Sequence, residues 1–551
     1  MASEREIAFP RLTPDEIDAL RPYGRERDVS AGEVLISEFD RGFCFFVVLT
    51  GAIDILDHSG SAERVVTVHE PGEFTGDVDM LTGRASLIMG RAHAAGRVLE
   101  LDAKALRRAV EALPEIGDTI LKAFLTRRTL LLREGFEGIK IVGSRFSPEA
   151  HRLRDFATRN QIPFTWIDVE RDAQAEALLR QFGITPAETP VVIGSECGML
   201  NRPSTADLAR CFGLEVDLTG DEVYDLAVVG AGPAGLAASV YAASEGLKTI
   251  TFDASAAGGQ AGTSSRIENY LGFATGISGA ELTRNALLQA QRFGARVSVP
   301  EPVVGLRLDG GRRVLALESG AEVRARCVLV ASGVEYRKLA VPGYGDYEGA
   351  GIYYAATEME ARLCRGERAV VVGGGNSAGQ AIVYLSRFAR EVHVILRSDD
   401  MNKSMSRYLV ERIGSIPNVT VHHLCQVSSV AGTGHLRSVR LRYDDGREAD
   451  LGTSALFMFI GAAPYTSWLR GCVQLDAKGF VVTGDGISPE SLHGDAWRAV
   501  NRSPWLLETS LPGVFAAGDA RSGSVKRVAS AVGEGAMAVS LVHAHIGAPA
   551  V

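Results

Sequence analysis

The chain of 551 residues is long enough for roughly three to four domains, and its 46% hydrophobic and 23% charged residues are ordinary for a globular protein. Its net charge of −9 and pI near 5.8 argue against a nucleic-acid partner, because such partners usually select a basic face. No apolar run approaches the roughly 18 residues that span a bilayer, and residues 1–11 lack the apolar stretch of a signal peptide, so we expect a cytoplasmic protein without a membrane partner.

Residues 28–101 predict a β-rich domain. Period-two apolarity with frequent glycine turns favours a jelly roll or barrel. The segment 104–132 has helical spacing and is rich in Ala, Leu and Arg, so one or two helices close the domain. The apolar runs are 33–36, 45–49, 52–56, 65–68 and 97–101.

Within this domain, the segments 31–35, 45–51 and 71–77 resemble cyclic-nucleotide-binding domains, over about the first 135 residues. The resemblance implies a Gly-Glu pair on the ribose and an arginine on the cyclic phosphate. Here the pair is Gly76-Asp77, and Ser86 stands where the arginine belongs; Arg84 would serve only if the loop shifts. Because a buried phosphate needs a charged partner, we expect no cyclic-nucleotide binding and a packing or interaction role.

From Ile139 the pattern changes to a small α/β domain, with strands at 139–142, 164–168 and 189–193 and helices at 148–160 and 173–182. It resembles thioredoxin and glutaredoxin domains over residues 138–215, with Thr189-Pro190 at their cis-proline position. Such proteins need a low-pKa cysteine at the start of the first helix. This chain has Ser144-Arg-Phe-Ser147 there, and serine has no redox couple, so we expect a scaffold or docking domain.

A strand over 224–229 leads into Gly230-Ala-Gly232-Pro-Ala-Gly235 and a helix over 236–244. In this arrangement glycines let a pyrophosphate approach a helix N-terminus. Asp253 ends the next strand, where an acid binds a ribose hydroxyl. The spacing predicts a Rossmann-like dinucleotide-binding domain.

A second glycine fingerprint is Gly373-Gly-Gly375-Asn376-Ser377-Ala378. Asp253 lies 18 positions after Gly235, whereas 18 positions after Ala378 the chain has Leu396, followed by Arg397, rather than an acid. An arginine suits a 2′-phosphate, so the sequence favours NADP over NAD. Basic and acidic residues both follow over 399–407, so NAD binding, with Arg397 as a solvated loop charge, is the alternative.

The segments 258–260, 267–270, 331–333 and 513–519 carry a specific resemblance to low-molecular-weight thioredoxin reductases, over residues 222–545. The resemblance implies a homodimer with FAD, in which Asp519 binds the ribitol chain and 527–529 meet the isoalloxazine edge. The helix after 527 aims its positive end at the flavin. The cofactor-binding residues expected in all are Gly230, Gly232, Pro233, Ala234, Gly235, Asp253, Gly259, Gln260, Asn269, Ala331, Gly333, Gly373, Gly375, Asn376, Ser377, Arg397, Gly518, Asp519, Arg527, Val528 and Ala529.

The reductase family has Cys-Ala-Thr-Cys just before the second fingerprint, whereas this chain has Ala355-Ala-Thr-Glu358. Hydride still passes from nicotinamide to flavin, which needs only stacking and orientation, but reduction of a protein disulfide cannot follow. Cys364 is a weak replacement, and Glu358 is either a proton relay or a paired surface group. We therefore assign no catalytic residue.

None of the seven cysteines forms a Cys-x-x-Cys pair or a metal-ligand spacing, so the sequence predicts neither structural disulfides nor a metal site. They are Cys44, Cys197, Cys211, Cys327, Cys364, Cys425 and Cys472.

Together these features predict a multidomain protein whose C-terminal half is a pair of Rossmann-like FAD and NAD(P) domains. The leading function is transfer of hydride from NAD(P)H to FAD and of electrons onward to a non-disulfide acceptor: a quinone, ferredoxin, flavodoxin, small molecule or oxygen. The alternatives are a flavin oxidase or dehydrogenase of a small metabolite, and a non-catalytic redox or ligand sensor. The domains expected are a jelly roll with helices (1–135), a thioredoxin-like α/β domain (136–218), a first FAD-binding segment (219–342), the NAD(P) domain (343–465) and a second FAD-binding segment (466–551).

Overall fold

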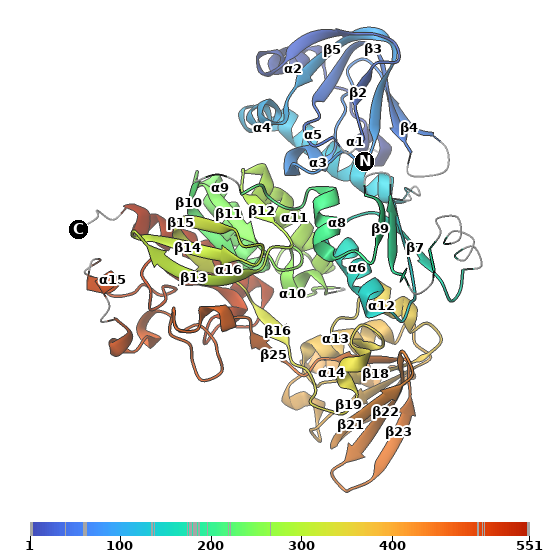
Figure 1. The fold of residues 1–551 in the computed structure, drawn as a ribbon, viewed down its shortest axis with the longest axis vertical. Coiled ribbons are helices and arrows are strands. Elements are labelled where there is room, and N and C mark those ends of the chain that lie inside the picture. Colours follow the sequence, from blue (N-terminus) through green and yellow to red (C-terminus); the bar gives the residue numbers. More distant parts are fainter. Residues whose placement is uncertain are drawn as a thin grey trace. The chain divides into compact units, whose positions relative to one another are not determined.

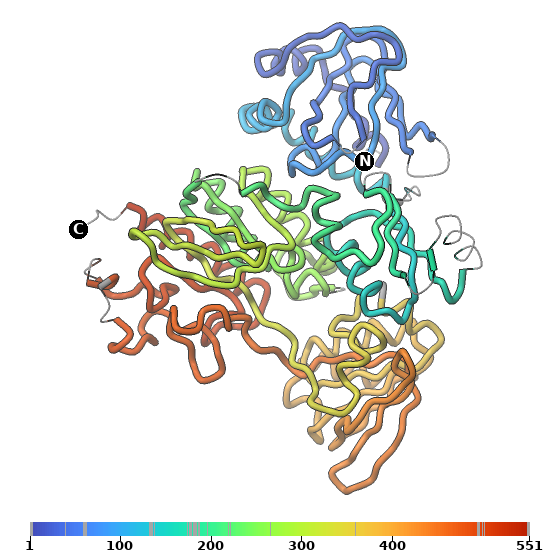
Figure 2. The backbone as a smooth tube through the Cα atoms, viewed as in Figure 1, coloured from blue at the N-terminus to red at the C-terminus, as the bar shows by residue number. Residues whose placement is uncertain are grey.

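Contacts between residues divide the chain of the computed structural model into two compact units (Figure 1; Figure 2 follows the backbone). The first unit contains Met1–Val142, Gln161–Ile167 and Gln174–Val216, and the second contains the rest. Residues 136–218 thus contribute to both, and the five domain boundaries drawn from the sequence stay predictions. The structure describes residues 4–38, 40–58, 63–133, 136, 138–172, 175, 179, 184–185, 188–194, 197–218, 220, 222–264, 266–492, 495–498, 500 and 502–547.

The first unit contains the β-rich domain that the sequence predicts. Its strands are β1 (Arg25–Val29), β2 (Val34–Ile36), β3 (Phe45–Asp57), β4 (Arg64–His69) and β5 (Met89–Leu101). They form an antiparallel sheet in the order β1-β5-β3-β4, with β2 on β5. The two long strands pair from Phe45 opposite Leu101 to Leu56 opposite Met89.

Helices close this sheet. They are α1 (Glu4–Ala8), α2 (Pro14–Leu20), the 3-10 helix η1 (Arg21–Tyr23), α3 (Val78–Thr82), α4 (Ala103–Ala112) and α5 (Pro114–Arg133). The helical region predicted over 104–132 is two helices, because Pro114 has no N–H to continue α4. Phe124 of α5 lies 6.3 Å, between ring centroids, from both Phe45 and Phe74, so α5 shares the aromatic core of the sheet.

The middle of the chain forms a four-stranded sheet in the order β7-β6-β8-β9. These strands are β6 (Ile139–Gly143), β7 (Phe164–Asp168), β8 (Val191–Gly194) and β9 (Gly198–Asn201). The helices are α6 (Pro148–Arg159) and α8 (Thr205–Phe212), and the Thr189–Pro190 bond before β8 is cis. The helix expected over 173–182 lies, apart from Ala175 and Leu179, outside the described residues.

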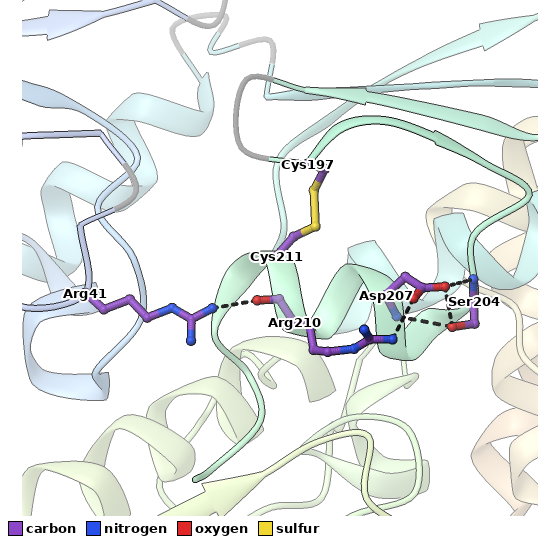
Figure 3. Close-up of a disulfide and its surroundings, with 6 residues drawn as sticks. All are labelled: Arg41, Cys197, Ser204, Asp207, Arg210 and Cys211. Atoms are coloured by element: carbon purple, nitrogen blue, oxygen red, sulfur yellow. Dashed lines mark hydrogen bonds and ion pairs between the residues drawn. A yellow bond between two sulfur atoms is a disulfide. The ribbon is translucent and has the colours of Figure 1, made fainter. Parts of the chain in front are cut away.

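The expectation of no disulfide was wrong: Cys197 and Cys211 are bonded, with their Cα atoms 5.6 Å apart (Figure 3). Cys197 lies in the turn between β8 and β9, and Cys211 lies in the last turn of α8. The pair is 14 residues apart, and only the folding of the hairpin onto the helix reveals it. Beside it, Arg41 donates a hydrogen bond to the carbonyl of Arg210.

The second unit contains a seven-stranded sheet in the order β12-β11-β10-β15-β14-β13, with β26 paired to β15. The strands β10, β11, β12, β15 and β26 are parallel, as in a dinucleotide-binding fold. They are β10 (Val223–Val229), β11 (Thr249–Phe252), β12 (Arg296–Ser298), β13 (Val303–Asp309), β14 (Arg312–Leu317), β15 (Glu322–Val330) and β26 (Val514–Ala516).

The helix α9 packs against both α11 and α16. The helices of this region are α9 (Pro233–Ser244), α10 (Gly259–Gly262), α11 (Gly279–Arg292) and α16 (Val528–Gly547). The shorter helices in the remainder of the second unit are η3 (Tyr344–Tyr347), η4 (Met401–Lys403), η5 (Ser467–Leu469), η6 (Gly484–Gly486), η7 (Pro489–Leu492), α15 (Asp495–Arg498) and η8 (Gly518–Ala520).

A second parallel sheet, in the order β17-β24-β18-β19-β20, follows in the same unit, with a three-stranded sheet β21-β22-β23 and the pair β16-β25. Its helices are α12 (Glu358–Leu363), α13 (Asn376–Leu385) and α14 (Arg407–Gly414). The strands are β16 (Val334–Tyr336), β17 (Ile352–Tyr353), β18 (Arg368–Val372), β19 (Glu391–Ile395), β20 (Val419–His422), β21 (Cys425–Gly432), β22 (Leu436–Tyr443), β23 (Glu448–Gly452), β24 (Ala455–Met458) and β25 (Ala462–Pro464). Across the described residues, no helix combines the length and apolarity needed to cross a bilayer.

Candidate functional site

The first glycine turn joins the end of β10 to the start of α9. Gly232 is the N-cap of α9 and has no side chain to satisfy the first N–H groups, so the helix presents them to a ligand. A Cβ on Gly235 would lie 1.8 Å from the Gly230 carbonyl oxygen, so only glycine allows the helix to begin this close to the strand. The turn therefore has the geometry of a pyrophosphate site.

Asp253 lies directly beside this turn. One carboxylate oxygen accepts a hydrogen bond from Ala231 N at 2.9 Å, and the other accepts from Ser255 N at 3.0 Å and Ala256 N at 3.1 Å. Because β10 and β11 are parallel neighbours, their carboxyl ends meet at this edge. The structure thus brings Asp253 to the glycine turn as the spacing predicts.

The segment 258–260 reaches the same turn from α10. A Cβ on Gly259 would lie 2.9 Å from the Cα of Gly232, so the two backbones touch. Gln260 donates from Nε2 to the Val334 carbonyl at 3.3 Å. Gly333, just before Val334, has a φ of +64°, and Ala331 is buried. Asn269 is exposed and forms no hydrogen bond with any described residue, so the structure does not join it to this group.

The C-terminal segment packs on α9 from the start of α16. A Cβ on Gly535 would lie 2.1 Å from the Ala234 carbonyl oxygen, and one on Gly518 would lie 3.0 Å from the Ala234 Cβ. Burial raises the pKa of Asp519, while the charge of Lys526 lowers it. Arg527, Val528 and Ala529 stand at the N-terminus of α16, as expected from the sequence.

Glu534 and Lys526 were not among the predicted site residues. Glu534 accepts a hydrogen bond from Gly518 N at 2.7 Å and binds the Arg521 guanidinium, so it fixes the turn before α16. Lys526 donates to the carbonyl of Asp519 at 2.6 Å. A lone acid within an apolar helix gives no spacing signal, and only the fold reveals this role.

The second glycine turn joins β18 to α13. Gly373 has a φ of +138°, and a Cβ there would lie 2.2 Å from the Phe459 carbonyl oxygen. Gly375 is the N-cap of α13 and again has no side chain. Asn376 accepts a hydrogen bond from Ser406 N at 2.7 Å, whereas Ser377 is exposed. Asn376 therefore ties the turn to the start of α14.

Arg397 follows buried Leu396 at the end of β19 and is exposed. The other basic residues nearby are already paired: Lys403 with Asp399, and Arg407 with Glu411 at 2.8 Å. Among the described residues, Arg397 forms no ion pair, so its guanidinium is available to an anion beside the second glycine turn.

The segment before β18 was expected to match the reductase dithiol. Ala355 is half-buried, and Glu358 is exposed and paired with Arg362 at 2.5 Å, which favours the surface-group interpretation of Glu358. The buried acid is Glu360 instead, which accepts a hydrogen bond from Thr357 N at 2.8 Å. Burial raises the pKa of Glu360, whereas its hydrogen bonds with Thr357 lower it.

Residues 224–535, more than half of the chain, match the sequence model of the family described as pyridine nucleotide-disulphide oxidoreductase. The chain belongs to this family. Residues 26–112 match the cyclic nucleotide-binding domain. This pyridine nucleotide-disulphide oxidoreductase is therefore a thioredoxin reductase-like flavoprotein with an N-terminal cyclic nucleotide-binding domain, and its family implies FAD and NAD(P)H.

Individual relatives agree with this assignment. The thioredoxin reductase of Treponema pallidum is 33% identical over 325 residues, which cover 59% of this chain and 97% of the relative. Among solved structures, the thioredoxin reductase of T. acidophilum has a TM-score of 0.52 at 29% identity, covering 59% of this chain and all (100%) of the other. That of Lactococcus lactis has a TM-score of 0.52 at 25% identity, with 59% and 99% covered.

The two glycine turns of this oxidoreductase fit the cofactors that its family implies. Each ends a parallel strand, begins a helix and places a glycine without a capping side chain at the helix N-terminus. The residues fit a dinucleotide in both turns, with Asp253 at the first and Arg397 at the second.

The cyclic nucleotide-binding domain has its own candidate site after β4. Asp77 of the Gly76-Asp77 pair turns inward and accepts a hydrogen bond from Asp79 N at 2.9 Å, which caps α3. Ser86 is buried and donates to the Ile88 carbonyl. The charges of Asp79 and Asp77 attract the guanidinium of Arg84.

Proposed function

We propose that the protein is an NADPH-dependent FAD oxidoreductase that passes electrons to an acceptor other than a protein disulfide. A quinone, ferredoxin, flavodoxin, small molecule or oxygen is such an acceptor. The segment that matches the reductase dithiol carries the proposal, because Ala355 and Glu358 stand where the reductases have cysteines. Without cysteines at these two positions, thiol–disulfide exchange has no attacking group there.

Cys364 does not replace the missing pair. It is fully buried in the core of the second parallel sheet. Burial, and then the charges of Glu360 and Glu367, raise the pKa of its thiol to about 12. Since the thiolate is the nucleophile, Cys364 is inert near neutral pH.

Contacts of α6 support a docking role for the middle of the chain. The rings of Phe146 and His435 stack with centroids 3.8 Å apart, and the rings of His151 and Tyr353 lie 5.3 Å apart. Ser147, at the position matched to a thioredoxin cysteine, caps α6 by accepting a hydrogen bond from Ala150 N. The start of α6 thus packs against Tyr353, two residues before Ala355. None of the four residues in these two ring contacts is a cysteine.

The chain's own groups bind and orient the cofactors. The open N–H groups at the start of α9 bind the pyrophosphate, and Asp253 accepts hydrogen bonds from a ribose. The N-terminus of α16 adds a positive potential next to Asp519. When bound, the flavin accepts hydride from the nicotinamide and releases electrons in one- or two-electron steps.

Arg397 supports the choice of NADPH. Its guanidinium is exposed and unpaired among the described residues, and a 2′-phosphate supplies the missing anion. NADH lacks that phosphate and gains nothing from Arg397.

Anaerobic mixing of the holoprotein with NADPH or NADH tests the proposal. We expect NADPH to bleach the flavin absorbance, and we expect the reduced protein to be reoxidised by at least one quinone, ferredoxin, flavodoxin or oxygen. Thioredoxin in its disulfide form should not reoxidise it. Absence of bleaching would move the assignment to an oxidase or a sensor, and fast reoxidation by thioredoxin would refute the non-disulfide outlet.

A further inference from the structure

The cyclic nucleotide-binding domain contains a cavity between its sheet and α5. It is partly open to solvent. Much of its wall is apolar, formed by Phe9, Ile55, Val66, Ile88, Leu130 and Leu131. An apolar wall of this extent suits a hydrocarbon or aromatic body.

Arg127 of α5 lines the cavity and is only 9% exposed. Its Nε donates to the Ala8 carbonyl and its Nη1 donates to the Gly76 carbonyl, each at 2.7 Å. Nη2 has no hydrogen-bond partner among the described residues. The guanidinium carbon lies 4.7 Å from the ring centre of Phe74 and 5.3 Å from that of Phe9, so the cation is held firmly in place.

Among the described residues, no acid forms a hydrogen bond or an ion pair with this cation. Asp77 accepts from Asp79 N, and Asp79 accepts from the Arg128 guanidinium at 2.9 Å. Asp77, which also lines the cavity, and Glu73 act on Arg127 only through their charges. A buried arginine held by carbonyls and rings, without a carboxylate bonded to it, is a site for an anion.

We propose that this cavity binds an amphipathic anion, with a carboxylate or phosphate head on Arg127 and an apolar body along the wall. The charge of Arg127 comes from α5, outside the 26–112 match, whereas the loop at 76–88 contributes Gly76, Asp77 and Ile88 to the cavity wall but no cation. The inference is independent of the electron acceptor, because it concerns only the first unit.

Calorimetric titration of the full-length holoprotein tests the inference. The probes are decanoate and decyl phosphate, used below their aggregation concentrations, with decanol as the uncharged control and cyclic AMP as the competing ligand. We expect at least one of the two anions to bind at least tenfold more tightly than decanol, and the stronger anion identifies the head group. Equal affinity for decanol, or binding of cyclic AMP alone, would overturn the inference.

Variants locate the site. Arg127→Gln removes the charge and should weaken anion binding at least tenfold, whereas Arg127→Lys should retain some of it. Val66→Phe fills the cavity without touching Arg127, and Val65→Phe is its matched control because Val65 is 54% exposed and does not line the cavity. We expect Val66→Phe to lose binding and Val65→Phe to retain it. Equal binding by these two valine variants would place the anion elsewhere.

Discussion

Gly235 occupies the tightest point of the first glycine turn, where a Cβ would lie 1.8 Å from the Gly230 carbonyl oxygen. Neither partner is a flexible side chain, so an added methyl group must displace the backbone of the turn. We expect Gly235→Ala to lose most of its bound flavin, measured as the ratio of flavin to protein absorbance. The loss should be at least fivefold relative to the wild type.

A second helical glycine separates this steric effect from a general effect of alanine. Gly414 ends α14 in open space, with no heavy atom within 4 Å of the place where an alanine methyl group would lie. Gly414→Ala should keep full flavin content, because alanine favours the helix by roughly 0.5–1 kcal/mol. Full flavin content in both variants would show that Gly235 does not shape the site.

Arg397 offers a test of coenzyme choice. A charge-assisted bond to a 2′-phosphate is worth roughly 1.5–3 kcal/mol, so Arg397→Leu should lower the second-order rate of flavin reduction by NADPH about tenfold or more. The rate with NADH should change less than twofold. A stopped-flow series over both coenzymes measures the two rates, and equal losses would count against phosphate recognition.

At the residue scale, some site residues follow from spacing and others do not. Asp253 is predictable because parallel strands end at one edge, which brings an acid at the end of β11 to the glycine turn. Glu534 is not predictable, since its role depends on a hydrogen bond from Gly518 N, 16 residues earlier in the chain. Glu360 is a local case, because it accepts a hydrogen bond from Thr357 N at the start of its own helix. The roles of the predicted residues in binding stay predictions.

At the scale of elements, the Cys197–Cys211 bond joins the β8–β9 turn to the end of α8 (Figure 3). Closing a loop of this length stabilises a fold by about 3 kcal/mol in the chain-entropy description. We expect Cys211→Ser, or treatment with reductant, to lower the thermal midpoint of the first unit. Thiol titration in denaturant should find five thiols in the unreduced protein and all seven after reduction. Seven thiols without reductant would show that the bond is not formed.

Local pattern predicts elements better than it predicts their joints. The apolar runs at 45–49 and 97–101 predict β3 and β5, although residues 45–48 of β3 are buried on both faces of the strand. The same reasoning does not find the cysteine pair, since a hairpin and a helix meet only after the sheet has formed. It also gives no indication that Phe146 stacks on His435, because the two residues lie far apart in the sequence.

At the scale of the second unit, the C-terminal segment contains a buried ionic network. Glu508 is fully buried and binds Arg502 at 2.6 and 2.9 Å, and it also accepts a hydrogen bond from Gly513 N. His545 of α16 lies beside this network, 3.4 Å from the Arg502 guanidinium. Because α16 packs on α9, disturbing the network should loosen the first glycine turn, at the start of α9.

The titration of His545 therefore links this packing to pH. Burial, and then the charge of Arg313, lower the pKa of His545 from 6.5 to about 4. Between these values the unfolded chain binds a proton that the native state does not, so the free energy of unfolding falls as the pH falls. The contribution of neutral His545 to the free energy of unfolding is fully present above pH 6.5. About 2 kcal/mol of it is lost as the pH falls from 7 to 5.

We expect flavin release on heating to occur at a lower temperature at pH 5 than at pH 7, and we expect His545→Gln to reduce that difference. Glutamine cannot gain a proton, so the variant lacks this one source of acid sensitivity while other groups still titrate. His543→Gln, two residues away on α16, is the matched control because His543 is 40% exposed and pairs with Glu245 at the surface. Flavin fluorescence during heating measures all three proteins. If His545→Gln and His543→Gln retain the same pH dependence as the wild type, the network around Glu508 does not set the acid stability of the second unit.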